Sequence, residues 1–140
     1  GEVTVSVLLM QRETRKAHEL PTLMRDHGLT VKVCRTRTEA TKLMTGRHAG
    51  TWSLFAIDFG ADQAATTNPV QSDFASSVNH VLREMSTRQI LIPTIAFQEE
   101  MSTDRIVKTM RAGMLEVLLP PYTKHKLRGL LKYVLKPSDL

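Results

Sequence analysis

The chain has 140 residues, 41% hydrophobic and 24% charged, with a formal charge of +5, as expected of one soluble globular domain. The single cysteine, Cys34, excludes a disulfide framework and a cysteine-rich zinc site, and predicts a buried thiol in a reducing cytoplasmic setting, or a nuclear one in a eukaryote. No apolar run is long enough for a membrane span, and no signal peptide pattern is present.

The hydrophobic pattern alternates between strand-like and helix-like segments along the chain. The expected strands cover residues 3–10, 29–34, 54–57, 90–97 and 117–119. The expected helices begin at residues 12, 36, 72, 102 and 123. Thr36 and Glu39 form a capping box at the start of the second helix, whereas Pro21 should kink the first helix or delay its start. Residues 60–72 lack periodicity and should form a loop.

Five consecutive strand–helix units predict a parallel sheet with helices on both faces and right-handed crossovers. The strands are apolar on both sides, as a doubly covered sheet requires. We therefore predict an α/β fold of the flavodoxin-like, doubly wound type, with a five-stranded parallel sheet in the order 2-1-3-4-5. Residues 1–140 would form a single domain, and the non-Met start at Gly1 suggests a domain excised from a larger protein.

Asp58 is the candidate functional residue because it closes the expected third strand. In this topology, ligand and signal sites lie beyond the carboxyl ends of the first and third strands. A carboxylate at this edge of the sheet can act as a nucleophile or a metal ligand. It can also simply hydrogen-bond the loop that follows and order its first turn.

Three short segments, together with the topology and Asp58, resemble the receiver domain of two-component response regulators over roughly residues 3–136. The segments are IPTIAF at 92–97, RAGM at 111–114 and LLPP at 118–121. The resemblance implies a domain that phosphorylates itself on the aspartate of the third strand. It also implies two acids after the first strand that help to hold Mg²⁺, a Thr or Ser after the fourth strand, and a Lys after the fifth.

In this chain those four positions fall on Met10, Gln11, Gln98 and Pro120, none of which supplies the required group. Each missing electrostatic partner should cost a factor of about 10² to 10³ in rate. We therefore expect a degenerate phosphorylation pocket around Asp58, with no catalytic residue, no metal and no cofactor.

The resulting hypothesis is a pseudo-receiver, a non-enzymatic protein-protein interaction or regulatory module for signal transduction inside a larger signalling, clock or transcription protein. The first alternative is a divergent but phosphorylatable receiver with Asp58 as phosphoacceptor, in which Glu13 or Glu99 replaces the absent acids.

The resemblance also implies that the fourth helix, fifth strand and fifth helix form the face used for output and dimerisation. Residues 105–140 carry eight Lys/Arg against two Asp/Glu, which predicts a partner with an acidic surface. The candidate interaction residues are Arg105, Lys108, Arg111, Lys124, Arg128 and Lys132. The partner would be another domain of the same protein, a separate protein, or a second copy in a homodimer. The second alternative is a basic module that contacts nucleic acid through its last helix, although no nucleic-acid-binding signature is present.

Overall fold

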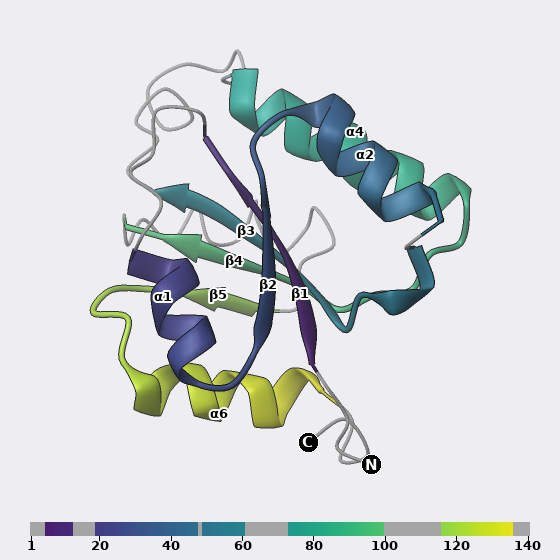
Figure 1. The fold of residues 1–140 in the computed structure, drawn as a ribbon. Coiled ribbons are helices and arrows are strands. Elements are labelled where there is room, and N and C mark those ends of the chain that lie inside the picture. Colours follow the sequence, from purple (N-terminus) through teal and green to yellow (C-terminus); the bar gives the residue numbers. More distant parts are fainter. Residues whose placement is uncertain (1–4, 13–18, 48, 61–72, 100–115, 136–140) are drawn as a thin grey trace.

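A computed structural model describes residues 5–12, 19–47, 49–60, 73–99 and 116–135. Five parallel strands form one sheet in the order β2-β1-β3-β4-β5, which confirms the predicted topology (Figure 1). The strands are β1 (Ser6–Gln11), β2 (Thr30–Cys34), β3 (Leu54–Gly60), β4 (Thr94–Gln98) and β5 (Glu116–Leu118). The helices are α1 (Glu19–Asp26), α2 (Arg37–Thr45), the short 3-10 helix η1 (Ala49–Thr51), α4 (Asp73–Thr87) and α6 (Lys124–Val134).

Helices cover both faces of the sheet, α1 and α6 on one side and α2 and α4 on the other (Figure 1). Successive strand residues point to opposite faces, so each strand contributes to two cores. The core under α1 and α6 includes Val7, Leu9, Leu54, Ala56 and Leu127. The core under α2 and α4 includes Leu8, Met10, Phe55, Ile57 and Val81. This double burial explains why the strands are apolar on both sides.

The helix ends follow the local signals in the sequence. The Thr36 hydroxyl accepts a hydrogen bond from the Glu39 amide at 3.1 Å, and this confirms the N-terminal half of the predicted capping box. Thr123 caps α6 in the same way through the Lys126 amide, also at 3.1 Å. Pro21 lies in the first turn of α1, where its missing N–H would have no helical partner in any case.

Several predicted strand limits were wrong, and the errors in β4 and β3 lie beside Asp58 and its neighbouring strand. β4 begins at Thr94 rather than at residue 90, because Pro93 has no N–H and contributes only its carbonyl, which accepts from the Phe55 amide at 2.9 Å. β3 does not close at Asp58 but continues to Gly60. The helix expected from residue 102 and most of the loop expected over 60–72 lie outside the described residues.

Candidate functional site

Three buried polar residues lie near the carboxyl ends of three neighbouring strands. The β1–β3 register places Gln11 beside Asp58, and the β3–β4 register places Asp58 beside Phe97 and Gly60 beside Gln98. Gln11, Asp58 and Gln98 are each only 1% exposed. Three residues that are far apart in the sequence therefore lie on adjacent strands at the position where this fold builds its sites.

The Asp58 carboxylate accepts hydrogen bonds from neutral groups on β1 and on its own strand. Gln11 Nε2 donates to Asp58 Oδ2 at 3.0 Å, and the Gly60 amide donates to Asp58 Oδ1 at 3.0 Å. The second bond spans two residues and closes a turn at Gly60, which has a φ of 57° in the left-handed region. Phe59 is the extra residue of β3 at this irregularity in the register. Asp58 therefore orders the end of its own strand.

The orientation of the Gln11 amide follows from this arrangement. The opposite orientation would turn Oε1 toward the carboxylate and set two acceptors against each other. In the observed orientation, Gln11 Oε1 is buried and has no hydrogen-bond partner among the residues that the structure describes. A buried amide oxygen without a partner is unfavourable, so this cost opposes the stabilisation that the bond to Asp58 Oδ2 provides.

The resemblance to receiver domains implies Mg²⁺ beside Asp58, and the residues present do not fit that ion. Gln11 presents an N–H group to the carboxylate where a metal site would need an oxygen ligand. Met10 packs in the apolar core with the residues of α2 and α4, on the face of β1 opposite to Gln11. Neither Met10 nor Gln11 therefore supplies an anionic ligand for Mg²⁺ beside Asp58.

The structure brings together some of the predicted pocket residues and separates others. Gln11 contacts Asp58 directly, and Gln98 ends the adjacent strand, whereas Met10 belongs to the core. Pro120 lies exposed beyond the end of β5. Sequence reasoning missed Gly60, although an Asp followed two residues later by a Gly is a known turn signal.

It also missed Arg35, whose Nη1 donates to the Arg12 carbonyl at 2.8 Å and ties the end of β2 to the end of β1. No local sequence pattern predicts this contact, because the two residues meet only when β1 and β2 pair.

Other chemistry receives little support from the described residues. Cys34 is fully buried, and burial raises the pKa of its thiol to about 12, with a smaller contribution from the Glu39 carboxylate. Within the described ranges, His, Cys, Asp and Glu nowhere gather in a group of three that could hold a metal ion. None of the described helices is long and apolar enough to cross a bilayer.

Part of the predicted basic surface lies on α6. Lys124, Arg128 and Lys132 are exposed along one stripe of this helix, as their spacing predicted. Arg105, Lys108 and Arg111 lie outside the described residues.

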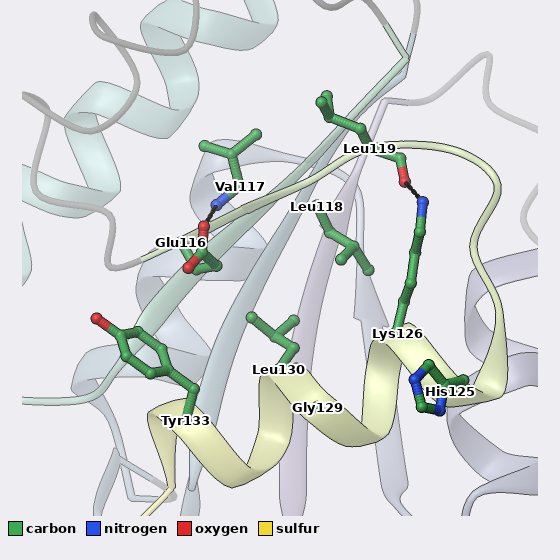
Figure 2. A pocket seen from close by; sticks show the side chains of 9 residues that line it. All are labelled: Glu116, Val117, Leu118, Leu119, His125, Lys126, Gly129, Leu130 and Tyr133. Carbon is green, nitrogen blue, oxygen red and sulfur yellow. Dashed lines mark hydrogen bonds between the residues drawn. The ribbon is translucent and has the colours of Figure 1, made fainter.

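Beside this stripe, a groove of about 440 Å³ runs between β5 and α6 (Figure 2). It is lined by Glu116, Val117, Leu118, Leu119, His125, Lys126, Gly129, Leu130 and Tyr133. Lys126 Nζ crosses to β5 and donates to the Leu119 carbonyl at 3.2 Å, as Figure 2 shows. Tyr133 is 72% exposed at the edge of the groove.

Comparisons with known proteins identify the fold. No family model matches the chain, and no curated protein matches it either. Among solved structures, it is similar to a response regulator receiver domain protein from Clostridium thermocellum, with a TM-score of 0.67 and 18% identity over 93% of each chain. It is also similar to the receiver domain of the Francisella response regulator 1452, with a TM-score of 0.65 and 17% identity over 94% of this chain and 96% of that one.

A third similar structure is the Vibrio cholerae chemotaxis protein CheY4, with a TM-score of 0.65 and 18% identity over 94% of this chain and 99% of that one. The chain therefore has the flavodoxin-like fold of response-regulator receiver domains, as the sequence resemblance implied.

Proposed function

We propose that this chain is a pseudo-receiver, a non-enzymatic module that acts in signal transduction by binding another domain or a protein partner. The observation that carries the proposal is the hydrogen bond from Gln11 Nε2 to Asp58 Oδ2. It places a neutral amide where phosphotransfer in this fold would need an acid that holds a metal ion. The receiver fold then remains as a scaffold for its surfaces.

The electrostatics of the pocket oppose phosphorylation. A phosphoryl donor is anionic, and the Asp58 carboxylate that would attack it is itself almost inaccessible. Both carboxylate oxygens already accept hydrogen bonds, which draw electron density from them and lower their nucleophilicity. Pro120 supplies no ammonium group to compensate the incoming charge. Each missing stabiliser lowers the rate by about 10² to 10³.

Beryllofluoride with Mg²⁺, a mimic of the aspartyl phosphate, tests the proposal directly in a ¹⁵N-labelled sample. The amide resonances of residues 58–60 should stay in place, because neither Gln11 nor Pro120 supplies a charge that would draw the mimic to the carboxylate. The Asp58→Ala variant is the control for shifts that arise elsewhere. Changes centred on Asp58 in the parent protein that disappear in this variant would overturn the proposal.

One observation favours a divergent but phosphorylatable receiver as the second candidate. The Glu99 amide donates to the Gly60 carbonyl at 3.1 Å, so the Glu99 backbone lies against the turn that Asp58 orders. Its carboxylate is one candidate for the missing acid; the other candidate, Glu13, lies outside the described residues. This candidate requires Mg²⁺ to bind in the millimolar range and to lose affinity on Glu99→Gln or on Glu13→Gln. A flat calorimetric titration with Mg²⁺ would eliminate it.

A further inference from the structure

The strand β2 forms an edge of the sheet, because it ends the strand order and pairs with β1 on one side. In Figure 1, β2 lies in front of β1, with α1 and α2 drawn to either side of it. No strand among the described residues pairs with the other side of β2. Such an edge presents main-chain N–H and C=O groups that can pair with an added strand.

The register shows which main-chain groups of β2 face this open edge. The Thr30 amide donates to the Val5 carbonyl at 3.0 Å, so the main-chain groups of Thr30 point toward β1. This direction alternates along a strand, so the main-chain groups of Lys32 also point toward β1. The N–H and C=O groups of Val31 and Val33 therefore point to the open edge.

The Arg25 side chain gives independent evidence for this direction. Arg25 lies in the last turn of α1, and its Nη2 donates to the Val31 carbonyl at 3.2 Å. The guanidinium therefore stands where the N–H group of an added strand would lie. The bond is exposed to solvent, so an incoming N–H group can replace it and release the guanidinium to water at little cost.

The side chains of β2 determine the pattern of an added strand. Val31 and Val33 are half-buried and pack against the core under α1 and α6. Lys32 points to the opposite face of the sheet and is exposed. Apolar side chains of an added strand would continue the face of the two valines, and carboxylates would lie beside Lys32. The sequence that fits this edge therefore alternates apolar and acidic residues.

The charge and chemistry of the edge distinguish between its occupants. Residues 30–37 carry three cations, Lys32, Arg35 and Arg37, and no acid. A second copy that added its own β2 would bring two cationic segments together, and like charges on facing strands are destabilising. A nucleic acid has no amide backbone that could continue the hydrogen-bond ladder. An extended polypeptide with regularly spaced acids satisfies both the main-chain groups and the charge.

We propose that the open edge of β2 binds an extended segment of a partner protein as a sixth strand, and that this segment alternates apolar and acidic residues. Its main chain pairs with Val31 and Val33 after Arg25 leaves the Val31 carbonyl. Its apolar side chains extend the face of the two valines, and its carboxylates lie beside Lys32. The proposal rests on the proposed function, a module that binds a protein partner, and names how such a partner binds.

A synthetic hexapeptide of alternating glutamate and valine, acetylated and amidated, tests the proposal on the ¹⁵N-labelled domain. The peptide should slow hydrogen exchange at the Val31 and Val33 amides, whose N–H groups face the open edge. The Lys32 amide should exchange slowly with or without the peptide, because it faces β1. A peptide of alternating lysine and valine should bind more weakly by about tenfold or more. Unchanged exchange at the two valine amides would overturn the proposal.

Two N-methylated forms of the peptide test the main-chain pairing itself. One form carries methyl groups on its valine amides and the other on its glutamate amides, so each blocks a different edge of the added strand. One form should lose about tenfold or more in affinity and the other should keep its affinity, because strand addition uses one edge only. The sensitive form also reports the direction of the added strand. Equal affinities for the two forms would refute strand addition.

Two charge variants of the domain test the side-chain contact. Lys32→Glu should weaken binding of the glutamate–valine peptide by about three- to tenfold, because a facing pair changes from attraction to repulsion. Lys124→Glu is the matched control, since Lys124 is also exposed and begins α6, which follows β5 at the other end of the strand order. An affinity that Lys32→Glu leaves equal to that of the parent would refute the proposal.

Competing occupants are tested on the same samples. A concentration-dependent dimer that protects the Val31 and Val33 amides would refute a partner segment in favour of a second copy. Single-stranded DNA that protects these amides as strongly as the peptide would refute a polypeptide. A beryllofluoride response at Asp58 would refute the proposed function while the peptide data remain interpretable. Absence of peptide binding with an unresponsive Asp58 would refute the β2 proposal alone.

Discussion

The bond between Gln11 and Asp58 can be weighed by a double-mutant cycle with Gln11→Leu and Asp58→Ala. Gln11→Leu takes a donor away from a buried carboxylate, and such a bond contributes about 1.5–3 kcal/mol to the free energy of unfolding. The same substitution removes Gln11 Oε1, a buried oxygen without a partner, whose burial costs about 1–3 kcal/mol. The two terms nearly cancel, so the single substitution should change stability little.

The second background separates the two terms. In Asp58→Ala the carboxylate is absent, and Gln11→Leu then only removes an unfavourable buried amide, so it should stabilise the fold. The coupling free energy between the two sites should therefore be about 2 kcal/mol, the contribution of the charged hydrogen bond. The cavity that Asp58→Ala creates is present in both the single Asp58→Ala variant and the double variant, so its cost cancels from the coupling free energy.

Urea unfolding followed by Trp52 fluorescence measures this coupling. Trp52 is the single tryptophan, it is half-buried, and its Nε1 donates to the Leu43 carbonyl at 3.0 Å, so its emission should change on unfolding. A coupling of this size corresponds to a difference of about 1 M in urea midpoint. A coupling below about 0.5 kcal/mol, or one of opposite sign, would refute the view that Gln11 holds Asp58.

Three further predictions concern the response to Mg²⁺, the buried thiol and two glycines. Gln11→Asp sets a second carboxylate beside Asp58 and should create a Mg²⁺ site. Mg²⁺ at about ten times its Kd should then raise the melting temperature of this variant by about 4 °C. An equal rise in the parent protein would contradict the account. Burial raises the pKa of Cys34 from its ordinary value of 9.0 to about 12. As the pH rises, the thiol therefore loses its proton in the unfolded state before it does so in the folded state. The free energy of unfolding should then fall by roughly 1 kcal/mol per pH unit above pH 9. Urea midpoints measured at about pH 8 and about pH 10 should fall less in Cys34→Ala than in the parent protein, because the variant has no thiol to ionise. An equal fall in both proteins would contradict this prediction. Gly129→Ala should stabilise the domain by about 0.5–1 kcal/mol, because alanine favours a helix interior more than glycine does. Gly28→Ala should destabilise the domain, because Gly28 has a φ of 86°. Calorimetry that gives both variants a change of the same sign would refute the reasoning.

Local patterns predicted much of the fold. The Thr36 cap depends on a side chain and an amide three residues apart, and the burial of Leu127, Leu130 and Leu131 depends on helical spacing. The alternation of strands and helices predicted parallel strands joined by crossovers, and five such units matched the known flavodoxin-like strand order. These features need no knowledge of distant contacts.

The candidate site could be predicted only in part. The register that joins Gln11 to Asp58 spans 47 residues of sequence, and a strand that is apolar on both sides does not reveal which face each residue takes. For this reason Met10 and Gln11 entered the prediction as one pair, whereas Met10 packs in the core and Gln11 contacts the carboxylate. The groove beside Gly129 depends on how α6 docks against β5, which no periodicity encodes.

Intact-protein mass spectrometry after incubation with acetyl phosphate and Mg²⁺ tests the central claim most directly. The account predicts that the protein keeps its original mass, because Asp58 is buried and hydrogen-bonded, and Gln11 presents an amide to it rather than an acid. The addition of one phosphoryl group that maps to Asp58 and disappears in Asp58→Ala would contradict it.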